Sequence, residues 1–122
     1  MRRWSPARFQ EELEHILQSL RPYGPQKVIL FGSFARGDDH GLSDVDLLII
    51  KETDQPFVER IGEVLALCDT VLPVEPLVYT PEELARLIEE GNPFIEQVLR
   101  EGKVVYESEP PGSPSVVISG QL

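Results

Sequence analysis

Two short apolar runs separated by a polar segment constrain this 122-residue sequence more than any other feature. Lys27–Phe31 reads KVILF and Val45–Ile50 reads VDLLII, and both runs predict buried strands. Asp44 and Asp46 stand where the chain enters the second run. Charge at the edge of a core is costly unless something compensates it. The two aspartates therefore call for a compensating partner.

The remaining patterns predict an α/β (α+β) domain, with one small sheet and helices packed on one face. A third apolar run, Val74–Tyr79, contains Pro76, which predicts an edge strand or a bulged strand there. We expect the domain to span residues 1–107, followed by a flexible Pro/Gly/Ser-rich tail over 108–122. The expected elements are helices over 6–20, 55–68, 81–90 and 93–101, and strands over 27–31, 45–50, 74–79 and 103–107.

Composition narrows the classes of function. The formal net charge is −10, from 21 acidic and 11 basic residues, which argues against binding of long nucleic acid. Most of these acids are also explained as solvated helix faces that favour solubility. The single cysteine, Cys68, excludes an internal disulfide and lies in the apolar register of a helix. No signal peptide or membrane-length apolar run is visible, so we expect a cytoplasmic protein that contacts no membrane.

The aspartate pair favours a metal ion. Residues i and i+2 of a strand point to the same face, so Asp44 and Asp46 are expected to project side by side. Two like charges about 4 Å apart cost on the order of 4 kcal/mol at an intermediate dielectric. Oxygen ligands without cysteine or histidine suit Mg²⁺, or Mn²⁺, and leave coordination positions open for phosphate oxygens.

The end of the first strand supplies the second half of the expected site. Gly32 allows a close backbone approach, Ser33 offers a hydroxyl donor, and Arg36 lies about one helical turn further along. The segment is neither a Walker A loop nor a dinucleotide fingerprint. A glycine–serine pair after a strand, or an isolated Asp-x-Asp, is common in structural roles. The two together on neighbouring strands favour a polyphosphate site.

These residues carry a family resemblance. Two short motifs resemble the signature of the DNA polymerase β nucleotidyltransferase superfamily. They are GSFARG, which begins at Gly32, and DVDL, which begins at Asp44, with ten residues between Ser33 and Asp44. Over about Val28–Leu84 the chain is most similar to the minimal nucleotidyltransferases, antitoxin-like partners of HEPN-domain proteins. The resemblance implies a mixed sheet with an open active face. It also implies that Gly32 and Ser33 hold a nucleoside triphosphate and that Asp44 and Asp46 bind two Mg²⁺ ions.

The resemblance implies a third carboxylate on a later strand, and Glu75 is the residue that matches it. Glu75 would complete the metal site and help to activate the attacking hydroxyl. The family usually has aspartate at this position and no proline after it, whereas this chain has Glu75–Pro76. This difference from the family affects the expected catalytic activity more than the expected fold. The alternative interpretation of Glu75 is an exposed acidic residue on an edge strand without a catalytic role.

The resemblance implies Mg²⁺-dependent transfer of a nucleoside monophosphate, AMP from ATP, to a hydroxyl acceptor. The expected acceptor is a side chain of a helical HEPN toxin, which the protein would counter as an antitoxin by AMPylation. The competing hypothesis is an inactive binding module that masks its partner. In a third reading the motif is fortuitous, and Asp44 and Asp46 lie far from Ser33.

Edge strands and apolar helix faces in so small a chain also favour oligomerisation.

Overall fold

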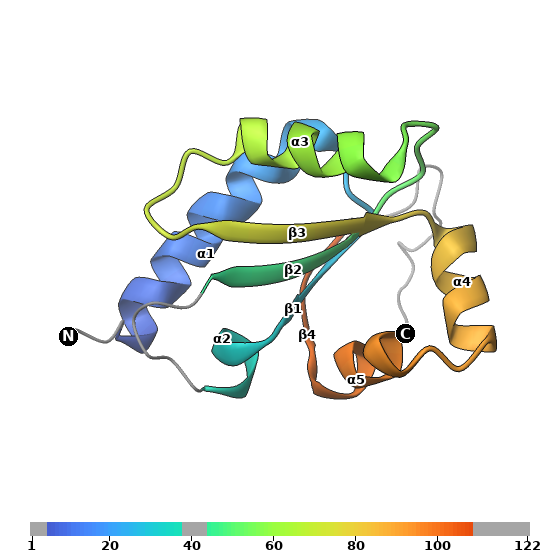
Figure 1. Cartoon of the computed structure of the whole chain (residues 1–122). Coiled ribbons are helices and arrows are strands. Elements are labelled where there is room, and N and C mark those ends of the chain that lie inside the picture. The colour runs from blue at the N-terminus through green and yellow to red at the C-terminus, as the bar shows by residue number, and fades with distance from the viewer. Residues whose placement is uncertain (1–4, 38–43, 109–122) are drawn as a thin grey trace, which may run out of the picture.

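The computed structural model describes residues 5–37 and 44–108, which form a four-stranded mixed sheet with helices on both faces (Figure 1). The strand order is β3-β2-β1-β4; β1 is antiparallel to β2 and β4, and β2 is parallel to β3. The predicted α+β class is confirmed, whereas the tail predicted over 108–122 lies outside the described residues from position 109 onward. The elements are α1 (Pro6–Leu20), the 3-10 helix η1 (Arg21–Tyr23), β1 (Lys27–Phe31), α2 (Ser33–Arg36), β2 (Val45–Ile50), α3 (Phe57–Leu67), β3 (Val74–Tyr79), α4 (Pro81–Glu89), α5 (Pro93–Glu101) and β4 (Lys103–Glu107).

Side-chain caps start the helices where the sequence predicts them. The Ser5 hydroxyl accepts a hydrogen bond from the Arg8 amide at 3.1 Å, and the Asn92 side chain accepts one from the Ile95 amide at 3.1 Å. Thr80 forms a full capping box at the start of α4, and proline occupies the first turn of all three helices. Each cap satisfies amide donors that have no partner inside the helix.

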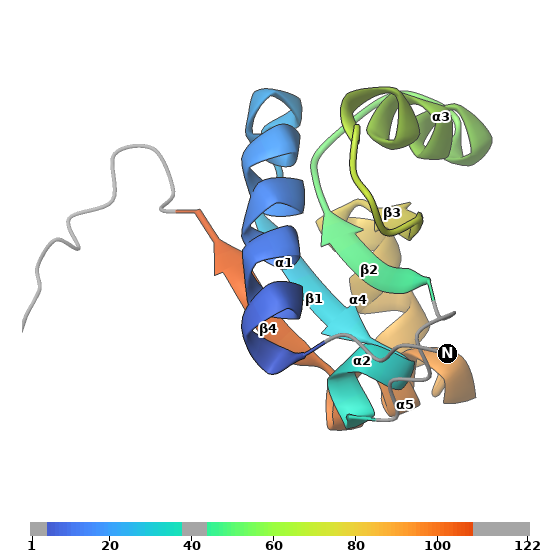
Figure 2. The same ribbon diagram turned by 90° about the vertical axis from the view of Figure 1, so that its left-hand side faces the viewer.

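The larger core lies between the sheet and the helices α1 and α3. Val28 and Leu30 of β1 face this side together with Leu47 and Ile49 of β2, and all four are buried. Figure 2 shows α1 lying across this face of the sheet. Helices on this face agree with the sequence prediction.

The opposite face is partly covered as well, which corrects the expectation that helices pack on one face alone. Ile29 and Leu48 point away from α1 and are buried against Ile95 and Val98 of α5. In Figure 2, α4 and α5 lie behind the sheet. The physical reason is present in KVILF and VDLLII, because near-continuous apolar runs are typical of strands that are buried on both sides.

The third strand is an edge strand, as the proline predicts. Pro76 lies opposite Leu47 in the parallel pairing, and within residues 5–37 and 44–108 β2 is the one strand that pairs with β3. Proline lacks an amide donor, so it is tolerated where one side of the strand needs no ladder. The proline therefore leaves Glu75 in register with Asp46 of β2.

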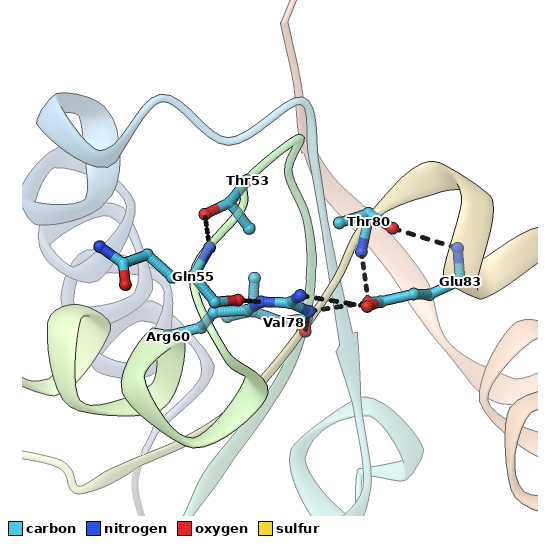
Figure 3. Close-up of polar contacts among 6 residues, drawn as sticks. All are labelled: Thr53, Gln55, Arg60, Val78, Thr80 and Glu83. Atoms are coloured by element: carbon cyan, nitrogen blue, oxygen red, sulfur yellow. Dashed lines mark hydrogen bonds and ion pairs between the residues drawn. The ribbon is translucent and has the colours of Figure 1, made fainter.

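A buried arginine joins α3, β3 and α4 (Figure 3). The Arg60 side chain is 6% exposed, and its Nη1 and Nη2 donate to the Glu83 carboxylate at 2.7 and 3.1 Å. Arg60 also donates to the carbonyls of Gln55 at 2.8 Å and Val78 at 3.0 Å. Glu83 in turn accepts from the Thr80 amide, so one carboxylate caps α4 and binds the arginine. This network fixes the end of β3 to the start of α4.

Cys68 and His15 behave as ordinary structural residues. Cys68 is half-buried against the larger core, and burial raises the pKa of its thiol. His15 is exposed on α1, with its ring Nε2 at 3.2 Å from the Asp69 carbonyl. Across residues 5–37 and 44–108, no helix combines the length and apolar character that crossing a membrane would require.

Replacing Arg60 with alanine is expected to lower the free energy of unfolding by about 2 kcal/mol, because the buried Val78 carbonyl loses its side-chain donor. The cost stays below that of a fully buried ion pair because the Glu83 side chain is 40% exposed and regains water. Urea unfolding at pH 7 measures the change. Arg100→Ala, at an exposed position of α5, is the matched control and should change stability by less than about 0.5 kcal/mol.

The same network predicts a loss of stability in acid. The hydrogen bond from Arg60 lowers the pKa of Glu83 below its usual value. A carboxyl with a lowered folded-state pKa stabilises the protein above its unfolded pKa, about 4.3, and this contribution disappears as the pH falls through the folded value. The difference in unfolding free energy between wild type and Glu83→Gln should therefore shrink below about pH 4. A difference that stays constant down to pH 3 would contradict this assignment, and Glu82→Gln serves as the control.

Candidate active site

The turn between β1 and α2 brings backbone close to a carboxylate. Gly32 has φ 78° and ψ −154°, a conformation that residues with a side chain rarely adopt. A Cβ atom added here would collide with the Asp46 carboxylate and lie 3.0 Å from its Cγ. Glycine is therefore required by two independent constraints, backbone conformation and space. The turn leads directly into α2, which begins at Ser33 (Figure 1).

Strand pairing assembles three acidic side chains from two strands. Asp46 pairs with Phe31 of β1 on one side and with Glu75 of β3 on the other. Asp44 immediately precedes β2 and is close enough for its charge to act on Asp46. The Glu75 carboxylate lies close enough to Asp46 for a side-chain hydrogen bond and its charge to raise the pKa of Asp46. The expected convergence of Asp44, Asp46 and Glu75 is thus present.

The electrostatics of this group centre on Asp46. Burial, the hydrogen bond with Glu75 and the charges of Glu75 and Asp44 raise the pKa of Asp46 to about 6, against an opposing effect of Arg36. A carboxyl among like charges resists ionisation unless a cation is supplied. The ionised carboxylates of this cluster therefore repel one another, and a bound cation would reduce this repulsion.

Arg36 extends from α2 toward α5 and borders a small cavity. Its Nη1 lies 3.8 Å from Oε1 of Glu101, and its charge also acts on Asp46. The cavity measures about 180 Å³, too small for a whole nucleotide, and lies between the glycine turn and α5. Its lining residues are Phe31, Gly32, Arg36, Phe94, Gln97, Val98 and Glu101.

Aromatic contacts hold the two walls of this region in place. Phe34 of α2 stacks on Phe9 of α1, with ring centroids 4.4 Å apart and an interplanar angle of 4°. Phe31, the last residue of β1, meets Phe94 of α5 edge to face at 5.7 Å. The short helix α2 is thereby anchored to the larger core, while α5 is anchored to the strand that carries the glycine turn.

The donor set suits a hard divalent cation once phosphate oxygens are added. Among the described residues, no group of three His, Cys, Asp or Glu side chains has an arrangement that could hold a metal ion unaided. Mg²⁺ typically takes only one or two carboxylates from the protein and completes its shell with water and substrate phosphates. Asp44, Asp46 and Glu75 provide oxygen donors alone, next to a turn in which a side chain at Gly32 would leave no room. The residues fit a site completed by the substrate.

The structure therefore brings together most of the residues singled out in the sequence. Gly32, Arg36 and the three carboxylates form one cluster, and Ser33 begins the helix beside it. The fortuitous-motif reading requires separation of the aspartates from Ser33, which the contact of Asp46 with Gly32 contradicts. Sequence reasoning missed the α5 wall, formed by Phe94, Gln97 and Glu101. These residues belong to no motif, and the only available signal was their position on the exposed side of an amphipathic helix.

Comparisons with known proteins agree with this geometry. The sequence profile of a family described as "Polymerase beta, Nucleotidyltransferase" matches residues 11–111. A protein of Methanocaldococcus jannaschii, named "Putative protein adenylyltransferase MJ0604", is 37% identical over 81 residues. The aligned region covers 66% of this chain and 78% of that relative.

Two solved structures share the fold. A toxin–antitoxin structure with AMP-PNP superimposes with a TM-score of 0.53 at 21% identity, covering 79% of this chain and 73% of the other. A mutant of the MntA-HpeT toxin–antitoxin gives a TM-score of 0.51 at 18% identity, covering 80% and 73%. Since the family profile spans most of the sequence and the acidic cluster lies beside the glycine turn, this chain belongs to the polymerase β nucleotidyltransferase family.

Proposed function

We propose that this nucleotidyltransferase transfers AMP from ATP to a hydroxyl group on a partner protein, and that the transfer depends on Mg²⁺. The observation that carries the proposal is the cluster of Asp44, Asp46 and Glu75 beside the Gly32 turn. The relative from M. jannaschii is named as a protein adenylyltransferase, which supports AMP as the transferred group and protein as the acceptor.

The proposed chemistry follows from the positions of these residues. Amide donors after Gly32, with Ser33 and Arg36, would bind the phosphates, and Asp44, Asp46 and Glu75 would hold two Mg²⁺ ions. When bound, these ions neutralise the phosphate charge and align the attack on the α-phosphorus. The acceptor oxygen bonds to the α-phosphorus, the bond to the oxygen bridging to the β-phosphate breaks, and pyrophosphate leaves. Glu75, or another carboxylate of the cluster, takes the acceptor proton.

The proposed acceptor belongs to a toxin partner. The two solved structures compared above are described as toxin–antitoxin structures, one of them with AMP-PNP. The net charge of −10 disfavours a long nucleic acid as acceptor. We propose a helical HEPN-domain protein carrying a hydroxyl-bearing side chain, such as tyrosine, as the substrate, with AMPylation as the means of neutralisation.

A second candidate function, masking of a partner without catalysis, is motivated by Glu75–Pro76. Glutamate replaces the aspartate that the resemblance implies, and Glu75 is an exposed residue of the edge strand β3. Calorimetric titration of the purified chain with ATP, with and without Mg²⁺, separates the two functions. Metal-dependent binding supports the enzyme, whereas no binding under either condition supports the masking module.

Asp44→Asn and Asp46→Asn are each expected to abolish incorporation of labelled AMP into the partner, because each substitution removes a proposed metal ligand. Both variants should unfold at a denaturant concentration close to that of wild type, since each retains the side-chain volume. Unchanged incorporation in either variant would rule out this site.

Gly32→Ala is expected to weaken Mg²⁺-ATP binding by at least tenfold, because the added Cβ collides with the Asp46 carboxylate. Gly37→Ala is the matched control, since Gly37 also has a positive φ, 80°, but a Cβ there meets nothing within 4 Å. Both variants carry backbone strain, so a selective loss in Gly32→Ala reports the steric effect. An equal loss of Mg²⁺-ATP affinity in both variants would contradict the role assigned to the close contact between Gly32 and Asp46. Calorimetry measures both affinities.

A further inference from the structure

The cavity beside the glycine turn contains an acidic side chain, Glu101, to which the proposed mechanism assigns no role. Oε1 of Glu101 lies 3.8 Å from Nη1 of Arg36 and accepts a hydrogen bond from Nε2 of Gln97 at 3.4 Å. Arg36 supplies the one positive charge among the described residues that line this cavity, and Glu101 supplies the one negative charge. The same oxygen of Glu101 thus meets the arginine expected to bind phosphate.

We propose that Glu101 is a positioning residue that competes with the triphosphate for the Arg36 guanidinium and so sets the affinity for nucleotide. This inference rests on the proposed function, because it assumes a triphosphate at the glycine turn. In the free protein Glu101 holds Arg36 over the cavity. When the triphosphate binds, the guanidinium exchanges the carboxylate for phosphate oxygens.

The order of the strands indicates which end of the nucleotide reaches α5. Glu75 lies on β3, Asp46 on the neighbouring β2, and Gly32 at the end of β1, with α5 beyond it. If Glu75 receives the acceptor proton, the acceptor approaches from the β3 side. In an in-line displacement the leaving group departs on the side opposite the nucleophile. The β- and γ-phosphates therefore extend toward Arg36 and the cavity at α5.

The exposure of the ion pair makes such an exchange inexpensive. The Arg36 and Glu101 side chains are 43% and 34% exposed, and exposed ion pairs contribute little to stability because water screens them. Phosphate oxygens bind a guanidinium at two points and carry more charge than one carboxylate. Glutamine at position 101 keeps the side-chain shape and a hydrogen-bond acceptor for Arg36 but removes the competing charge.

Calorimetric titration of the full chain with ATP and with AMP, both with Mg²⁺, tests the proposal. Glu101→Gln should tighten ATP binding by about three- to tenfold at low salt and change AMP binding by less than about twofold. Glu96→Gln is the matched control because it removes the same charge from α5 at a position facing Gly91, where the carboxylate oxygen lies 3.8 Å from a Cβ built on the glycine. We expect no change for it.

A double variant distinguishes an effect through Arg36 from simple repulsion. In an Arg36→Ala background, Glu101→Gln should no longer tighten ATP binding. A gain that persists without Arg36 would overturn the proposal, as would a Glu101→Gln variant that matches Glu96→Gln or tightens AMP as much as ATP. If the wild-type protein binds ATP with Mg²⁺ and one of these contradicting results is obtained, only the proposed role of Glu101 is wrong. If wild type binds no ATP, the proposed function itself falls.

Discussion

The close approach of the Asp46 carboxylate to the backbone of Gly32 is the contact on which the site depends. It needs a residue without a side chain at the end of β1 and a charged residue at the start of β2, in an antiparallel pair that aligns Phe31 with Asp46. Any side chain at position 32 would separate the glycine turn from the acidic cluster. Ionisation of Asp46 is unfavourable at this position, and its pKa is raised to about 6, chiefly through burial.

The mixed sheet explains how so small a domain gathers these groups. The antiparallel neighbour β1 ends at the glycine turn beside the start of β2, and the parallel neighbour β3 starts beside the same end of β2. The turn and Glu75 therefore lie on either side of Asp46. The larger core lies on the α1 and α3 side, and a smaller core packs α5 against the opposite face. At the acidic end of that opposite face, Asp46 is half-buried and Glu75 is exposed.

Local features of the sequence were sufficient to predict most of the fold and the central cluster. The apolar runs, the proline at the start of each capped helix and the positions of Gly32 and Asp46 depend on neighbours in the chain. Pro76 likewise indicated an edge strand, which the strand order confirms. The near-continuous apolar runs of β1 and β2 are typical of strands covered on both faces, so the second helical layer had a local signal. The α5 wall had none, because the contacts of Phe94 and Glu101 with Phe31 and Arg36 join segments more than 60 residues apart. No local pattern encodes such a contact.

The central claim is that the acidic cluster and the glycine turn form one site for a triphosphate and divalent cations. Anomalous diffraction from crystals of the full chain soaked with Mn²⁺ and a non-hydrolysable ATP analogue tests it directly. The account predicts at least one Mn²⁺ peak within coordination distance of Asp44 and Asp46, bridged to phosphate oxygens that lie against Gly32. Phosphates bound elsewhere, or Mn²⁺ peaks only at other acidic residues, would contradict it.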